Sequence, residues 1–119
     1  MTKRLVELDH NGRATEVDWK RLHRHAMAVK EYLDQHPSCP EIPNLRERAM
    51  PLVQAALSRT LIVPNIRDPF IWEGREGLLP GGFSKVFNRF MNIVAGLDRD
   101  YANRIEKDGK VYAWVDFED

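Results

Sequence analysis

The spacing of apolar residues constrains the fold of this 119-residue chain more than any other feature. From Trp19 to Leu33, and again from Phe83 to Val94, apolar side chains recur every three or four residues, which places them on one face of a helix. In the segment 110–117, by contrast, they occupy every second position, as in a strand with one buried face. A chain that contains both periods is predicted to be an α+β protein.

Local signals predict where most of these elements begin and end. The first helix should start after Asp18, a good N-cap residue, and stop near His36, because Pro37 disfavours helical geometry in the residue before it. A second helical pattern covers residues 45–57, where Pro51 should either kink the helix or mark a late start. The helix that begins near Phe83 should end at Gly96, and a further short helix is predicted over 98–107, before a turn at Asp108-Gly109.

The N-terminal segment 5–17 is predicted to form a β-hairpin around Asn11-Gly12, with Leu8 opposite Thr15. That register also opposes Glu7 and Glu16, so the second strand should be short or absent. Residues 60–63 are compatible with a short buried strand or a helix end. The predicted architecture is therefore one domain over 1–119, with three or four helices packed on a small antiparallel sheet formed by the N-terminal hairpin and the C-terminal strand. We expect the core to contain Leu22, Val29, Leu33, Leu52, Ala56, Phe87, Phe90, Val94, Val111 and Val115.

Composition argues against several classes of protein. Eighteen basic and eighteen acidic residues cancel, which leaves no overall field that would draw the chain to nucleic acid or to an anionic membrane. The apolar runs are too short to cross a bilayer, so no membrane association is expected. Cys39 is the only cysteine and cannot form an internal disulfide, and the N-terminus lacks the apolar core of a signal peptide. These features predict a cytoplasmic protein.

The segment 64–82 is the most distinctive candidate for function. It holds three of the seven prolines and four of the seven glycines, and it reads as a long irregular loop. Its aromatic centre, Phe70, Ile71 and Trp72, together with Trp114 on the C-terminal strand, is the predicted contact surface for another protein or for a second copy of the chain. The competing interpretation is that Phe70 and Trp72 fold back onto the core.

Nucleic-acid binding is the alternative hypothesis. Lys85, Asn88, Arg89 and Asn92 share one face of the helix that begins near Phe83, and such side chains contact bases and phosphates in nucleic-acid complexes. Three residues of the first helix would extend the basic surface, namely Lys20, Arg21 and Arg24. The simpler interpretation is that this face is only solvated, as the outer face of any amphipathic helix is.

Catalytic and metal signals are weak. A small enzyme with an anion site near Gly81, Gly82 and Lys85 is the third hypothesis, but these glycines match neither a P-loop nor a dinucleotide fingerprint, and no nucleophile elbow is present. No catalytic residue, cofactor or metal is predicted, because the candidate ligands lack the spacing that converges on one ion; they are His10, His23, His25, His36 and Cys39. The leading hypothesis is therefore a non-enzymatic accessory or regulatory domain that binds a protein partner.

Overall fold

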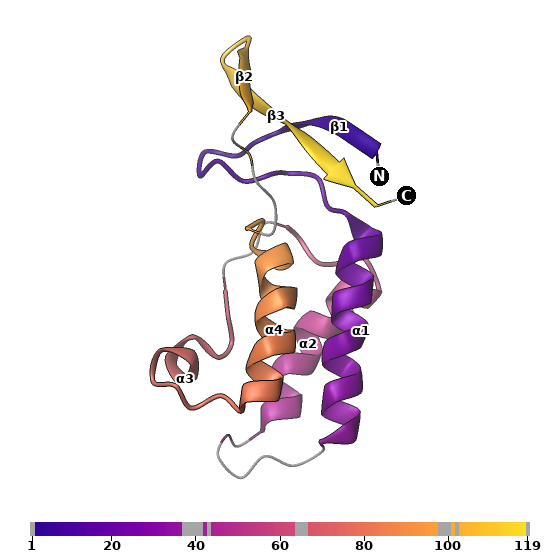
Figure 1. The fold of residues 1–119 in the computed structure, drawn as a ribbon, viewed down its shortest axis with the longest axis vertical. Coiled ribbons are helices and arrows are strands. Elements are labelled where there is room, and N and C mark those ends of the chain that lie inside the picture. The colour runs from indigo at the N-terminus through magenta and orange to yellow at the C-terminus, as the bar shows by residue number, and fades with distance from the viewer. Residues whose placement is uncertain are drawn as a thin grey trace.

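The computed structural model describes residues 2–36, 42, 44–63, 67–97, 101 and 103–118, and within them the fold is α+β, as predicted. Four helices and three strands are present in this part of the chain (Figure 1). Their order is β1 (Thr2–Glu7), α1 (Trp19–Gln35), α2 (Leu45–Leu57), α3 (Ile71–Arg75), α4 (Gly81–Val94), β2 (Arg104–Lys107) and β3 (Lys110–Phe117).

The three strands form an antiparallel sheet in the order β1-β3-β2, so the first and last strands of the chain lie side by side. The predicted helix at 98–107 is wrong for residues 104–107, which form β2; residues 98–100 and 102 lie outside the described part. The reason is the turn at Asp108-Gly109, where φ angles of 54° and 76° give the two-residue connection that joins paired strands. The predicted turn and C-terminal strand are both confirmed.

The predicted N-terminal hairpin is reduced to one bridge, between Leu8 and Ala14. The third strand of the sheet is β2, which pairs with β3 and not with β1. The register differs by one residue from the predicted pairing of Leu8 with Thr15. The carboxylate of Asp9 explains the difference, because its Oδ1 accepts hydrogen bonds from the backbone N–H groups of Asn11 (2.9 Å) and Arg13 (3.0 Å). These bonds hold a turn in which Gly12, at φ 76°, and not Asn11 takes the left-handed conformation.

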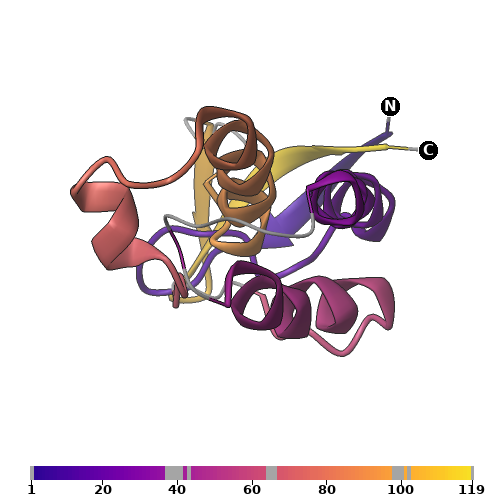
Figure 2. The same cartoon turned by 90° about the horizontal axis from the view of Figure 1, so that it is seen from below.

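The three longer helices surround a shared apolar core, and α3 stands outside them beside α4 (Figure 2). The predicted bounds of α1 are confirmed, since the Oδ1 atom of Asp18 accepts a hydrogen bond from the backbone N–H of Arg21 and His36 is the C-cap. The α2 helix continues through Pro51, so this proline does not mark a late start. Residues 60–63 form no strand. Eight of the ten predicted core residues are buried; Leu52 and Val111 are partly buried.

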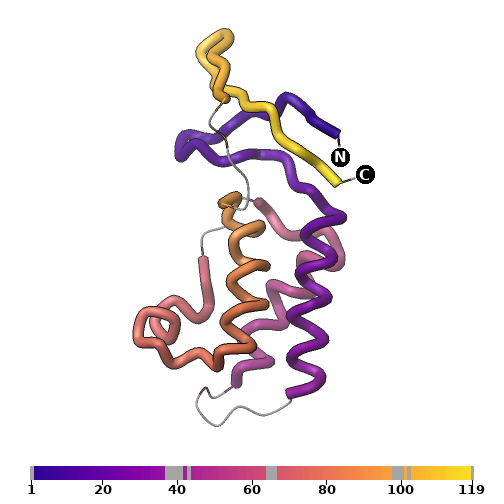
Figure 3. The backbone as a smooth tube through the Cα atoms, viewed as in Figure 1, coloured from indigo at the N-terminus to yellow at the C-terminus, as the bar shows by residue number. Residues whose placement is uncertain are grey.

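The sheet lies at one end of the helices, and both described chain ends are found there (Figures 1 and 3). Its inner face carries a second apolar cluster that includes Val6, Tyr101 and Val115. Asp18 connects the two parts, because its Oδ1 caps α1 while its Oδ2 accepts a hydrogen bond from the backbone N–H of Glu118 at 2.8 Å. The ion pair between Arg24 and Glu118, at 2.7 Å, adds a second connection.

Candidate functional site

The segment around α3 is more ordered than the predicted irregular loop. The Oδ1 atom of Asp68 accepts a hydrogen bond from the backbone N–H of Phe70 at 2.7 Å, just before the five-residue helix begins. After the helix, Gly77 takes a φ of 69°, and the backbone N–H of Leu78 donates to the carbonyl of Glu73 at 2.9 Å. A helical turn therefore lies beside α4, with a hydrogen bond to Asp68 just before it and a hydrogen bond from Leu78 just after it.

Phe70 anchors this turn in the core. Its side chain is fully buried and meets the rings of Phe83 and Phe87 edge to face, with centroid separations of 5.4 Å and 5.2 Å. This geometry is a favoured one for aromatic pairs. The structure thus places Phe70, one of the four predicted contact residues, where no partner can reach it, and its role is to hold α3 against α4.

Arg48 of α2 holds the same turn from the other side. Its Nη2 donates a hydrogen bond to the carbonyl of Pro69 at 2.6 Å and lies 2.7 Å from Oε1 of Glu73. The guanidinium carbon also lies 4.5 Å from the centroid of the Phe70 ring. The hydrogen bond from Arg48 holds the pKa of the Glu73 carboxyl below its usual value. The side chain of Arg48 therefore contacts Pro69 and Phe70, just before α3, and Glu73 within it.

Ile71 and Trp72 point outward from this anchored turn. Ile71 is 53% exposed and Trp72 is 62% exposed, and Leu78, at the end of the turn, is also exposed. We call these three residues the α3 surface. For Trp72 the prediction of an exposed aromatic side chain agrees with the structure, whereas for Phe70 the competing interpretation of burial does. Phe70 and Trp72 lie two positions apart at the start of the helix, which separates their side chains by about 200° around the helix axis. Only one of these two side chains can therefore face α4.

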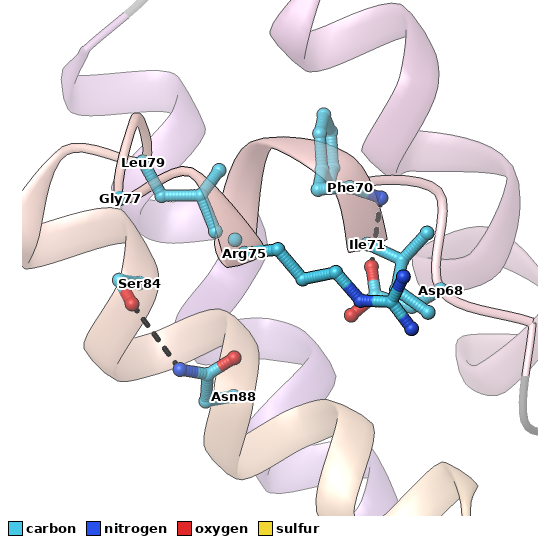
Figure 4. A pocket seen from close by; sticks show the side chains of 9 residues that line it. Asp68, Phe70, Ile71, Arg75, Gly77, Leu79, Ser84 and Asn88 are labelled. Carbon is cyan, nitrogen blue, oxygen red and sulfur yellow. Dashed lines mark hydrogen bonds between the residues drawn. The ribbon is translucent and has the colours of Figure 1, made fainter.

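A hollow of about 350 Å³ lies between the α3 turn and α4 (Figure 4). Asp68, Ile71 and Arg75 line it from the α3 side, and Ser84 and Asn88 line it from α4. The amide of Asn88 donates a hydrogen bond to Oγ of Ser84 at 3.2 Å. The hollow therefore joins the base of the α3 surface to the polar face of α4.

The predicted polar face of α4 is exposed at all four positions, Lys85, Asn88, Arg89 and Asn92. Arg89 also belongs to a group of positive charges that α1 and α4 bring together around His25. Burial lowers the pKa of His25 from its ordinary value of 6.5, and the charges of three guanidinium groups lower it further; they belong to Arg24, Arg21 and Arg89. The carboxylate of Glu118 opposes this effect.

The predicted anion site shows a structural reason for one of its glycines. A Cβ atom added to Gly82 would lie 2.9 Å from a ring carbon of Tyr32, so a larger residue there would force this ring to shift where α4 packs on α1. Gly81 has open space around it, and Lys85 is exposed. Among the described residues, no three His, Cys, Asp or Glu side chains gather as metal ligands would; Cys39 lies outside those residues.

Trp114, the fourth predicted contact residue, lies on β3 and is 50% exposed. The sheet and α3 occupy different ends of the molecule, so the structure does not bring Trp114 together with Ile71 and Trp72 (Figure 1). The predicted contact surface thus separates into two exposed surfaces and one buried anchor.

Sequence reasoning missed the residues that position or line the site: Arg48, Asp68, Arg75 and Ser84. A signal for the turn was available, because Asp68-Pro69 resembles a helix start and Gly77 a helix end. No local pattern indicated Arg48, since its partners lie more than twenty positions away in the chain.

Comparison with known proteins gives no family, because no protein-family model, curated protein or solved structure matches the chain. Within the part of the chain that the structure describes, no helix has the length and apolar character needed to cross a bilayer.

Proposed function

We propose that this chain is a non-enzymatic protein-binding domain of the cytoplasm, with an accessory or regulatory role, and that the α3 surface is its contact element. The observation that carries the proposal is the exposure of Trp72 on a turn anchored at both flanks. Tryptophan is among the residues most often found at the energetic centre of protein interfaces. An exposed tryptophan with a fixed backbone is the arrangement that favours binding.

The anchoring matters because association is opposed by the loss of conformational freedom. A side chain that is immobilised on binding costs about 0.5–1.5 kcal/mol, and an ordered loop costs more. The contacts of Phe70 and Arg48 remove much of the loop cost before a partner arrives. The expected partner presents an apolar pocket for the indole of Trp72, rimmed by groups that tolerate the mixed charges of Glu73 and Arg75.

The test is quantitative capture by the immobilised chain and by its Trp72→Ala variant, followed by affinity measurement with the purified captured protein. We expect Trp72→Ala to raise the dissociation constant at least about thirtyfold, the loss typical of an interface hot spot. The matched control is Ile62→Ala, which removes another exposed apolar side chain. Equal affinity of the wild type and a correctly folded Trp72→Ala variant would refute the proposal.

A second candidate function, nucleic-acid binding, is favoured by the group of positive charges around His25. Phosphates near these groups would raise the pKa of His25, which the positive charges now lower. The expected result is binding of an oligonucleotide that weakens steeply with salt and is reduced by Arg89→Ala, together with a raised pKa of His25 in NMR titration of the complex. Absence of binding at low salt would remove this candidate.

A further inference from the structure

The outer face of the sheet carries an apolar strip that none of the helices in the described part of the chain covers (Figure 1). Side chains at positions 112, 114 and 116 of β3 point away from the buried ones at 113, 115 and 117. The register places Leu5 of β1 opposite Trp114, and Ile105 of β2 opposite Tyr112. Leu5 is 44% exposed and Ile105 is 42% exposed. We call Leu5, Ile105, Tyr112 and Trp114 the outer strip.

Charged residues at the two ends of β3 give the outer strip a direction. Lys110 lies at the start of the strand, with its Nζ 3.9 Å from Oε1 of Glu7, and Asp116 lies near the end of the strand, opposite Lys3 of β1. Both residues are exposed on the same side as Tyr112 and Trp114. Along β3 this face therefore presents a positive charge, two aromatic side chains and a negative charge, in that order. When two such strands face each other in opposite directions, each positive charge meets a negative one and aromatic side chains meet aromatic side chains.

We propose that the outer strip packs against the outer strip of a second copy of this chain, with the two β3 strands antiparallel. A two-fold axis across Ala113 would then set Tyr112 of each copy against Trp114 of the other, and Lys110 of each against Asp116 of the other. In such an isologous interface every contact occurs twice, which is the usual arrangement in homodimers. The two facing sheets would form a sandwich about 10 Å thick between strand layers.

Charge complementarity selects both the occupant and its orientation. If the two β3 strands ran parallel, each Lys110 would face Lys110 and each Asp116 would face Asp116, and like charges in an interface are strongly unfavourable. In the antiparallel arrangement both pairs become attractive.

The test uses sedimentation equilibrium of the full chain with three kinds of variant. We expect a reversible dimer, and Trp114→Ala should raise its dissociation constant at least about thirtyfold. Lys110→Asp and Asp116→Lys should each weaken the dimer at least about tenfold, because each places like charges together twice. The double variant Lys110→Asp/Asp116→Lys should recover the affinity of the wild type.

Recovery in the double variant would identify a contact between copies. Six residues along a strand separate positions 110 and 116 by about 20 Å, well beyond the screening length of about 10 Å at 0.1 M salt, so the two charges hardly interact within one chain. The matched control is Ile62→Ala, which removes an exposed apolar side chain outside the outer strip and the α3 surface and should leave the dimer unchanged. Thermal unfolding of each variant checks that it folds. If Trp114→Ala does not fold, the charge variants still test the interface.

Three results would overturn the proposal. The first is a wild-type chain that stays monomeric up to about 100 μM, a concentration at which a dimer with a micromolar dissociation constant would predominate. The second is a dimer that neither Trp114→Ala nor the single charge reversals weaken. The third is retention of a single-stranded oligonucleotide that depends on Trp114 without dimerisation, which would assign the outer strip to stacking of bases instead.

Discussion

Replacement of Phe70 gives the most direct test of how α3 is held. The side chain is fully buried and forms two edge-to-face ring pairs with α4. Phe→Ala substitutions in protein cores cost about 3–5 kcal/mol. Phe70→Leu keeps most of the volume but loses the two ring pairs, each worth about 0.5–1.5 kcal/mol, so its expected cost is about 1–3 kcal/mol. The cost expected for Phe70→Ala is a large part of the roughly 5–15 kcal/mol by which a small domain is stable.

Urea unfolding followed by far-ultraviolet circular dichroism measures these losses, and hydrogen exchange locates them. We expect Phe70→Ala to speed exchange at the amide of Leu78, whose hydrogen bond closes the α3 turn. Trp72→Ala is the matched control from the same turn and should change the free energy of unfolding by less than about 0.5 kcal/mol. A loss below about 1 kcal/mol in Phe70→Ala would contradict the assignment of Phe70 as the anchor.

Three further predictions concern packing and pH. Gly82→Ala should destabilise the fold by about 1 kcal/mol through a clash with the neighbouring ring on α1, whereas Gly81→Ala, which has open space, should be neutral or stabilising by about 0.5 kcal/mol; urea unfolding of the pair tests the close approach. Arg48 lowers the folded-state pKa of Glu73, so the interaction between them stabilises the fold above pH 4.5 and this stabilisation is lost as the pH falls through the lowered pKa. Glu73→Gln should therefore make the free energy of unfolding depend less on pH in the acid range. The lowered folded-state pKa of His25 means that the unfolded chain binds its proton more readily, so stability should fall as the pH drops below about 6.5; His25→Gln should reduce that fall, and the opposite slope would refute the pKa direction.

The elements predicted well are those with local signals. The α1 helix begins after Asp18 because a carboxylate there accepts a hydrogen bond from a first-turn N–H, and it ends at His36, just before a proline. The alternation in β3 and the Asp108-Gly109 turn were predicted for the same reason. The strand β2 was missed because an apolar spacing of four residues, from Tyr101 to Ile105, was taken as helical, although the following turn favoured paired strands.

The α3 turn lies at the opposite extreme. A five-residue helix is too short to be stable by its own propensity, so its existence depends on contacts made elsewhere. Those contacts come from Arg48 on α2 and from the two phenylalanines of α4, and their positions relative to residues 67–80 follow from the packing of three helices. The composition of 64–82 indicated an unusual segment but could not show which of its aromatic residues would be buried.

By itself, the sequence determined the α+β class, the long helices and the C-terminal strand, because periodicity, caps and turn residues act within a few positions of one another. It also determined that Trp114 and Val115 lie on opposite faces of a strand, with Val115 in the core. Only the tertiary structure decided that Phe70 is buried and Trp72 exposed, on a helical turn where the sequence predicted an irregular loop. Burial depends on which surfaces distant segments bring together, and that information is not local.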